Sequence, residues 1–252
     1  MAVTIRAMTC GHLTIPLGFM LEGHDGEIKV PVCSYLVTHP RGTIVFDSGL
    51  HPVTQHEPQE HIGDFLAAFH QSDFSEGEAL AARLRSIDVD PESITYVVNS
   101  HLHFDHCGGN LQLPNATVVV QRDEWDAAPD LGLERGYVTA DFATGQPVQQ
   151  LAGEHDLFGD GTVVCVPTPG HTPGHQSLRV RTEHHEYVLC GDACYLKHAL
   201  DEMILPGVIA DPERARESFK VLRALRDAGA TIMYGHDPEF WRTVPQAPAE
   251  LA

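Results

Sequence analysis

The sequence has few basic residues and no apolar stretch long enough to cross a membrane. Its 252 residues include 16 lysines and arginines against 35 aspartates and glutamates, which gives a formal net charge of −19. Because nucleic-acid binding depends mainly on lysine and arginine contacts with phosphates, this charge argues against a nucleic-acid partner. No run approaches the roughly 18 continuous apolar residues of a transmembrane helix, so we also expect no membrane partner.

The sequence also lacks paired cysteines and an export signal. Its first residues, MAVTIRAMTCGH, contain no basic flank followed by an apolar core. The cysteines never form a C-x-x-C pair, and they are Cys10, Cys33, Cys107, Cys165, Cys190 and Cys194. We therefore expect a soluble, cytoplasmic protein with free thiols. Cys33, Cys165 and Cys190 stand in apolar runs, which indicates small core residues.

Apolar, β-branched runs bounded by turn residues recur along the chain and predict strands. These strands cover residues 28–39, 42–49, 94–100, 116–121, 161–167, 176–182, 186–192 and 230–235, with a hairpin at 39–42. Amphipathic helices are predicted over 76–88, 122–128 and 211–229, the last with Asp211 as N-cap and Pro212 in its first turn. Because the elements alternate without a linker, we expect one domain over residues 1–252 in which helices cover sheets.

Histidine, by contrast, is abundant, with 17 copies. The segment SHLHFDHCGG (100–109) places His101, His103, Asp105 and His106 directly after a predicted strand. Neutral imidazole and carboxylate are good ligands for Zn²⁺ and similar ions. The two glycines that follow permit the tight change of direction that such a cluster needs. The segment therefore favours a metal site over a solvated histidine-rich loop.

Three further motifs repeat one pattern, in which an apolar strand is followed by a glycine and then by a potential ligand. TPGHTPGH (168–175) offers His171, LCGDACY (189–195) offers Asp192, and YGH (234–236) offers His236. Strand ends are rigid places on which to mount chemistry. With the first segment, these motifs supply five histidines and two aspartates. That set is large enough for two metal ions.

In their combination and order, the motifs HLHFDH, GHTPGH, GDACY and YGHD resemble the metallo-β-lactamase superfamily over nearly the whole chain. The segments SHLHFDHCGGN and TPGHTPGHQSL and the spacing Asp192-x-x-Tyr195 are more specifically similar to its N-acyl-homoserine lactonases, which quench quorum sensing. The resemblance implies an α/β fold, an αβ/βα sandwich of two mixed β-sheets flanked by helices. It also implies an enzyme that opens the ring of N-acyl-homoserine lactones with a hydroxide that bridges two metal ions.

Carried over onto this sequence, the resemblance implies seven ligands for two divalent ions. The ligands are His101, His103 and His171 for one ion, Asp105, His106 and His236 for the other, and Asp192 as the bridge between them. The family usually holds zinc, although iron, cobalt or manganese can occupy such sites. The sequence departs from the family at Cys107, where relatives often carry alanine, and this places a thiol beside a ligand.

Two side chains are expected to be catalytic, Tyr195 by the resemblance and Asp105 because a ligand carboxylate can accept a proton from the nucleophile. Tyr195 would donate a hydrogen bond to the substrate carbonyl or to the developing oxyanion; the alternative is a buried aromatic residue at the rim of the site. Asp105 would pass a proton to the leaving oxygen. Phe104 lies between ligands in the sequence, and we expect it in the core.

Residues near the motifs receive supporting roles. His175 is expected to pack behind the ligands, and Asp47 to accept the second N–H of a ligand imidazole. The histidines in polar segments are expected at the surface; they are His51, His56, His61, His70, His184 and His185. The apolar stretches 12–26 and 198–212 would either line a channel for an acyl chain or pack on the partner subunit of a homodimer.

Other activities of the same fold remain as alternatives. A hydroxyacylglutathione-type thioesterase would need a cationic helical extension, and only 16 residues follow His236. A β-lactamase should be exported, and a processing nuclease needs a basic arm. A broad lactonase or phosphotriesterase stays open, as does a mono-iron sulfur dioxygenase. A diiron flavoprotein would carry an acid in place of His103, and a non-catalytic metal scaffold would leave Tyr195 without a purpose.

Overall fold

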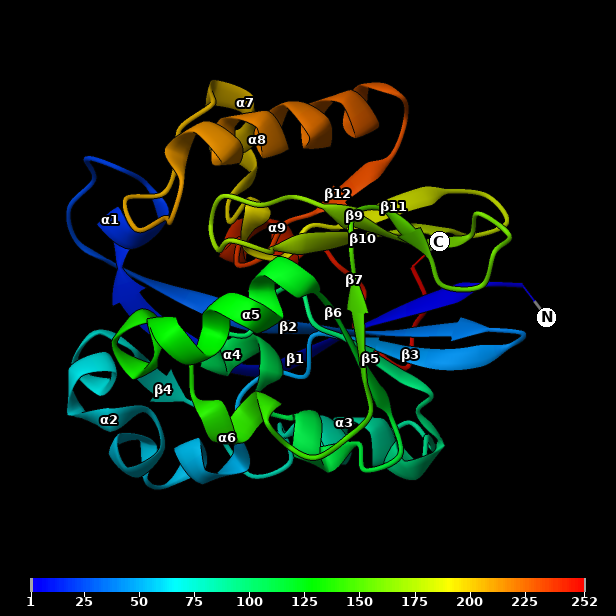
Figure 1. Cartoon of the computed structure of the whole chain (residues 1–252), viewed down its shortest axis with the longest axis horizontal. Helices are drawn as coiled ribbons and strands as arrows, with labels where there is room; N and C mark the ends of the chain where they lie inside the picture. The colour runs from blue at the N-terminus through cyan, green and yellow to red at the C-terminus, as the bar shows by residue number, and fades with distance from the viewer. Residues whose placement is uncertain (1, 252) are drawn as a thin grey trace.

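The computed structural model describes residues 2–251, which form two mixed β-sheets packed face to face with helices on the outside (Figure 1). One sheet has the spatial order β4 (Gln71–Asp73), β1 (Thr4–Pro16), β2 (Glu27–His39), β3 (Gly42–Phe46), β5 (Tyr96–Val98), β6 (Thr117–Gln121) and β7 (Val148–Leu151). The other has the order β12 (Thr231–Met233), β11 (Glu186–Leu189), β10 (Gln176–Arg181), β9 (Val163–Pro167) and β8 (His155–Asp156). The predicted αβ/βα sandwich is confirmed.

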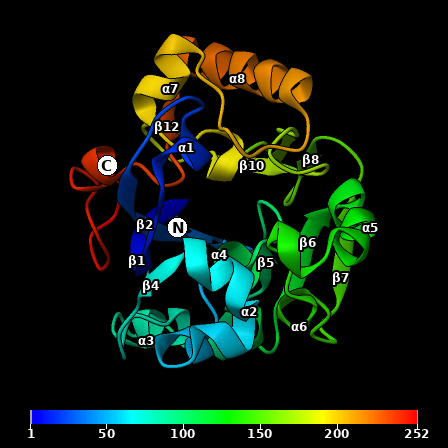
Figure 2. The same cartoon turned by 90° about the vertical axis from the view of Figure 1, so that its left-hand side faces the viewer.

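Most of the helices lie on the outer faces of the two sheets, as Figure 2 shows from the end of the sandwich. The α-helices are α1 (Leu17–Met20), α2 (Pro58–Phe69), α3 (Leu80–Arg85), α4 (Phe104–Cys107), α5 (Arg122–Leu131), α6 (Thr139–Phe142), α7 (Lys197–Glu202), α8 (Pro212–Asp227) and α9 (Pro238–Trp241). Short 3₁₀ helices are η1 (Pro52–Gln55), η2 (Pro91–Ser93), η3 (Asn110–Gln112), η4 (Leu133–Arg135) and η5 (Gly191–Ala193). Among residues 2–251, no helix combines the length and the apolar composition that crossing a membrane requires.

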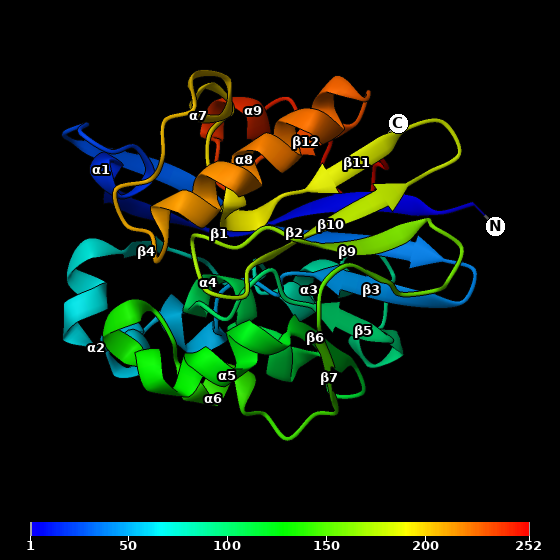
Figure 3. The same cartoon turned by 45° about the horizontal axis from the view of Figure 1, so that its top comes forward.

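The main core lies between the sheets, where their inward-facing side chains interlock. Phe46 and Val119 of the larger sheet pack in one cluster with Cys165, Leu178 and Leu189 of the smaller sheet. Successive side chains of a strand point to opposite faces of the sheet, so every second side chain points into this core. Helix α8 lies across the smaller sheet and buries its own apolar stripe there (Figure 3). The burial of apolar area on both faces of each sheet holds the strand ends in fixed positions.

The parallel strand pairs gather the polar motifs at one edge of the sandwich. Strands β3 and β5 are parallel, so Asp47 and His101, which follow them, emerge at the same edge. Strands β11 and β12 are also parallel and deliver Asp192 and His236. This pair ends in very close backbone contact, because a Cβ atom on Gly235 would lie 2.4 Å from the carbonyl oxygen of residue 191.

Each predicted strand and helix is present, but several are shorter than predicted, and strands β1, β4, β7 and β8 were missed. The helix predicted over 76–88 spans only Leu80–Arg85, because a turn closed by the Ser75 N–H bond to the Glu78 carboxylate precedes it. The apolar stretch 12–26 begins inside β1, and its first residues pair antiparallel with β2. Helix α2 was not predicted, because the glycine in its middle, Gly63, disfavours a helix; the helix kinks there, with φ of +74°.

Candidate metal centre

Three histidines from two separate segments converge at the edge of the sandwich. The Nε2 atom of His171 lies 3.2 Å from Nε2 of His101 and 3.1 Å from Nδ1 of His103. The same atom lies 3.3 Å from Oδ2 of Asp192. His101 and His103 follow β5, whereas His171 stands in the β9–β10 turn. We call these three histidines the first ligand group.

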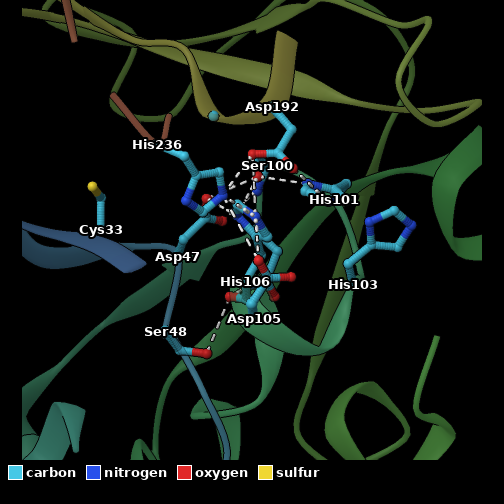
Figure 4. A network of polar contacts seen from close by, with 12 residues as sticks. Cys33, Asp47, Ser48, Ser100, His101, His103, Asp105, His106, Asp192 and His236 are labelled. Atoms are coloured by element: carbon cyan, nitrogen blue, oxygen red, sulfur yellow. Dashed lines mark hydrogen bonds and ion pairs between the residues drawn. The ribbon is translucent and has the colours of Figure 1, made fainter. Parts of the chain in front are cut away.

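A second set of ligands lies directly beside the first (Figure 4). The Nε2 atoms of His106 and His236 lie 3.3 Å apart, and Oδ2 of Asp105 is 3.5 Å from the former and 3.7 Å from the latter. His106 and Asp105 belong to helix α4, and His236 follows β12. We call these three residues the second ligand group.

Asp192 stands between the two groups and faces one carboxylate oxygen to each. Its Oδ2 atom is 3.3 Å from the His171 imidazole, whereas Oδ1 is 3.1 Å from His236 and 3.3 Å from His106. The Oδ1 atom is buried and accepts no hydrogen bond from the described residues. The structure thus brings together all seven residues that the sequence singled out, in the two sets that the resemblance implied.

The spacing of these atoms fits metal ions. A tetrahedral zinc ion with bonds of about 2.0–2.1 Å holds its ligands roughly 3.3 Å apart, which matches the nitrogen and oxygen separations in both groups. The Nδ1 atoms of His106 and His236 face oxygen acceptors and carry the ring protons, so their Nε2 atoms turn lone pairs toward the carboxylate oxygens unless a proton or a metal ion lies between them. A buried acceptor without a partner costs free energy. The donor set therefore fits a pair of divalent ions, one in each group.

The ligand imidazoles are oriented by bonds at their far nitrogens. The Nδ1 atom of His106 lies 2.8 Å from the Asp47 carboxylate, and Nδ1 of His236 lies 2.7 Å from the carbonyl oxygen of Pro31. The Nδ1 atom of His101 lies 2.9 Å from the Ser100 hydroxyl, which itself donates to Asp47 at 2.8 Å. Such partners fix the ring orientation and the tautomer. The expected contact of Asp47 with a ligand imidazole is present.

Burial and the carboxylates set the charge of the ligands. Burial lowers the pKa of His101, His103 and His171, so these rings are neutral at pH 7, which is the form that binds metal. Burial also acts to lower the pKa of His106, but Asp192 and two further carboxylates outweigh it and raise that pKa. Burial would raise the pKa of Asp192, yet the facing imidazoles hold it well below its usual value. The carboxylates are therefore ionised and attract cations.

A cavity of about 510 Å³ opens onto the two ligand groups. Its base contains His103, Asp105 and Tyr195, and its walls are apolar; the wall residues include Leu13, Ile15, Phe19, Phe65, Phe69 and Val208. The cavity volume suits a small organic ligand. Both apolar stretches that the sequence offered, 12–26 and 198–212, contribute wall residues. Phe104 is buried, as expected, and also reaches the cavity wall.

Tyr195 points its hydroxyl at the first ligand group. Its oxygen lies 3.2 Å from Nδ1 of His171. Burial, together with Asp192 and Asp105, raises the pKa of Tyr195 well above its usual value. When Nε2 of His171 faces a metal ion, its Nδ1 carries the proton and donates to the tyrosine oxygen. The hydroxyl proton of Tyr195 is then available to a ligand in the cavity.

Comparisons with known proteins agree with this geometry. A model of the metallo-beta-lactamase superfamily matches residues 29–236. The chain belongs to this superfamily. It is 36% identical over 238 residues to the N-acyl homoserine lactonase AttM of Azorhizobium caulinodans, covering 91% of this chain and 90% of the relative. It is 31% identical over 214 residues to an N-acyl homoserine lactonase of Bacillus thuringiensis, covering 84% and 83%.

A solved structure is similar over nearly its full length. An N-acyl homoserine lactone hydrolase, determined with the product N-hexanoyl-L-homoserine bound at its catalytic metal center, aligns with a TM-score of 0.89. The identity is 27%, and the alignment covers 98% of both chains. The agreement confirms the fold that the motifs predicted for this member of the metallo-beta-lactamase superfamily.

One buried residue that supports the site was missed by the sequence patterns. Glu124 accepts hydrogen bonds from the Leu102 N–H at 3.1 Å, from the Tyr137 hydroxyl at 3.0 Å and from the Gly174 N–H at 3.0 Å. It thereby joins the two segments of the first ligand group, and the Tyr137 ring packs edge-on against His103. Nothing local in the sequence marks this glutamate, because its three partners are brought to it only by the metallo-beta-lactamase fold.

The prediction of six surface histidines was wrong for three of them. His56, His184 and His185 are exposed, but His51, His61 and His70 are half-buried. His70 lines the cavity, and the rings of His51 and His61 stack on each other. These residues seemed to lie in a polar loop because α2 was not recognised. His175, as expected, is buried behind His101 and is not in either ligand group.

Proposed function

We propose that this protein is an N-acyl homoserine lactonase, a hydrolase that opens the lactone ring at a centre of two divalent metal ions. One observation carries the proposal: two ligand groups share the carboxylate of Asp192 at the base of an apolar cavity. The similarity to N-acyl homoserine lactonases over 91% of the chain supports the choice of substrate. We take both ions to be zinc, because imidazole and carboxylate ligands at tetrahedral spacing suit it.

In this proposal the seven residues divide as their geometry suggests. The first ligand group holds one ion, the second ligand group holds the other, and Asp192 bridges them. Ions bound there would supply an activated water near pH 7 and polarise the lactone carbonyl. The surrounding protein fixes the orientation of His106 and His236, because Asp47 and the Pro31 carbonyl accept hydrogen bonds from their Nδ1 atoms and leave Nε2 to face the metal.

Tyr195 and Asp105 act on the substrate in this proposal. The Tyr195 hydroxyl donates a hydrogen bond to the carbonyl oxygen, whose negative charge grows as water adds to the carbonyl carbon. Asp105 accepts a proton from the attacking water and, as the C–O bond of the ring breaks, passes this proton to the leaving ring oxygen. Water has added its hydroxyl to the carbon and its proton to the alkoxide, so the product is an N-acyl homoserine. Asp105 lies at the cavity base, within reach of both events.

The cavity walls would receive the acyl chain. Phe19 from α1 makes a tilted ring contact with Phe69 from α2, with centroids 5.9 Å apart, and Phe69 in turn packs edge-on against Phe65 of the same helix. Burying methylene groups against such walls contributes about 0.8 kcal/mol for each group. Glu134 and Arg135 supply polar groups in the same cavity, where an amide and a lactone oxygen need hydrogen bonds.

The remaining properties follow from composition. Six buried free cysteines support a cytoplasmic location, because reducing compartments keep thiols unpaired. The net charge of −19 supports a small-molecule partner rather than nucleic acid or an anionic membrane. We also propose that residues 1–252 act as a single domain, and that the enzyme works as a homodimer.

A substrate panel tests the proposed function. Metal-quantified protein is assayed in a pH-stat against N-acyl homoserine lactones, a thioester, a phosphotriester and a β-lactam. We expect one acid equivalent per lactone opened, the highest kcat/KM for the lactones, and complete loss of activity after chelation. Heat-treated protein at the same zinc concentration is the control for metal-catalysed hydrolysis. Higher kcat/KM for another substrate class, or unchanged turnover after the metals are removed, would contradict the proposal.

A further inference from the structure

A second cluster of metal-ligating side chains lies outside the centre described above. It consists of His51, just before η1, His61 in α2 and Asp141 in α6. One ligand atom from each residue lies within 4.8 Å of the other two. The cluster shares no residue with either ligand group and does not line the cavity. It joins three separate segments that pack behind the α4 loop, where the backbone nitrogen of His51 would lie 2.4 Å from a Cβ atom on Gly108.

The carboxylate of Asp141 is the group in this cluster that most lacks polar partners. Its side chain is 0% exposed. Its oxygens lie 2.9 Å and 3.0 Å from Nε2 of His61, and Oδ1 still lacks a hydrogen bond of acceptable geometry. Within residues 2–251, no lysine or arginine forms an ion pair with it. A buried carboxylate needs a cationic partner or several donors, and a single imidazole N–H shared between two oxygens is a poor substitute.

The two imidazole rings are stacked, an arrangement that disfavours a positive charge on both of them. Their rings stack with centroids 4.2 Å apart and planes 17° apart, a distance at which two imidazolium ions would repel. Burial lowers the pKa of His51, and the neighbouring His61 lowers it further. The Nδ1 atom of His51 accepts the Val53 N–H at 3.2 Å, which leaves Nε2 as its available nitrogen. Coordination through Nε2 moves the ring proton to Nδ1 and replaces this long hydrogen bond with a metal–nitrogen bond.

We propose that His51, His61 and Asp141 form a third divalent-cation site, distinct from the two-ion centre, that takes a first-row ion of the zinc class. Two imidazoles and one carboxylate are a common ligand set for such an ion, with water completing the coordination. The ion neutralises the buried carboxylate and fastens the first turn of α2 to the loop after β3 and to α6. The second half of α2 carries Phe65 and Phe69, so the site braces the apolar wall of the cavity.

Metal stoichiometry and thermal stability test this site. Protein whose two-ion centre is already loaded is equilibrated with zinc, and bound zinc is measured beside two variants, His61→Gln and Asp141→Asn. We expect the wild type to bind one more equivalent per chain than either variant. We also expect added zinc to raise the Tm of the wild type by roughly 5–10 °C at saturating concentration, with no such shift in the variants. His56→Gln, which changes an exposed histidine of the same segment, should behave as the wild type.

The outcomes separate this proposal from the proposed function. A wild type that saturates at the ions of the two-ion centre and still opens lactones rejects the third site alone. A protein with no lactonase activity that binds the extra zinc rejects the proposed function alone. Should Asp141→Asn fail to fold, His51→Gln replaces a half-buried residue and gives the same readout. The third site is also rejected if the variants still bind the extra equivalent of zinc. It is likewise rejected if the Tm of the wild type changes with pH but not with added zinc.

Discussion

The two ligand groups are built from the same residue types but are supported differently. In the first ligand group, the far nitrogens of His101 and His171 face hydroxyl groups, those of Ser100 and Tyr195. In the second, His106 faces the carboxylate of Asp47. A carboxylate partner makes an imidazole more basic and a stronger metal ligand than a hydroxyl partner does.

This difference suggests a division of labour between the two ions. The second ligand group also contains the carboxylate of Asp105, so it is the more negative half of the centre. An ion there would be held more tightly and would be less electrophilic. An ion in the first ligand group would keep more of its Lewis acidity, and Tyr195 lies on that side. An ion in the first group is therefore better suited to polarise a carbonyl, and the second group is better suited to bind its ion tightly.

The largest expected effect comes from removing the carboxylate that both groups share. In Asp192→Asn, an amide nitrogen replaces one of the two oxygens that face the ligand groups, and the negative charge is lost. The binding of both ions should therefore become weaker. We expect loss of at least one bound metal and a fall in kcat/KM of at least about 10³-fold. Elemental analysis and lactone hydrolysis on the same preparation measure this. Both ions retained with full activity would refute the bridging role.

A smaller effect is expected at the first ligand group alone. Tyr195→Phe removes the hydroxyl but keeps the ring, so both metal ions should stay bound. We expect kcat to fall by about 10²-fold with little change in KM, because the lost hydrogen bond strengthens only as charge develops on the carbonyl oxygen. Equal rates for the variant and the wild type would exclude Tyr195 from catalysis and leave it as packing against His171.

The smallest effects should reveal the asymmetry between the groups. Asp47→Asn removes the charged partner of His106, and we expect the metal affinity of the second group to fall about 10–100-fold. Ser100→Ala removes the hydroxyl partner of His101, and a loss of only a few-fold is expected in the first group. Competition with a chelator, followed for each ion, measures both. Equal losses in the two variants would mean that the groups are energetically alike.

Much of the centre was predictable because its ligands are local features of the sequence. His171, Asp192 and His236 each follow an apolar run that forms its own strand, and a glycine stands directly before each of them. The periodicity of such runs reports burial directly. Strand order, by contrast, was implied only by the resemblance to a known family, because nothing in a single run specifies its neighbour.

What could not be predicted depends on contacts between distant segments. Glu124 serves the first ligand group through Gly174, 50 positions away, and the pattern around it is that of an ordinary helix. His61 seemed to be a surface residue because its partner, Asp141, is 80 positions distant. Helix α2 was detectable in part, since Ile62 and Leu66 are at helical spacing, but the glycine between them, Gly63, indicated a break in any helix.

The close approach of the β11 and β12 ends has a consequence for how the centre can vary. No side chain separates residues 191 and 235, and the main chains themselves determine how far Asp192 stands from His236. Related enzymes could exchange one coordinating group for another and keep this spacing. A single added methyl group at position 235, although chemically inert, would wedge the two ligands apart.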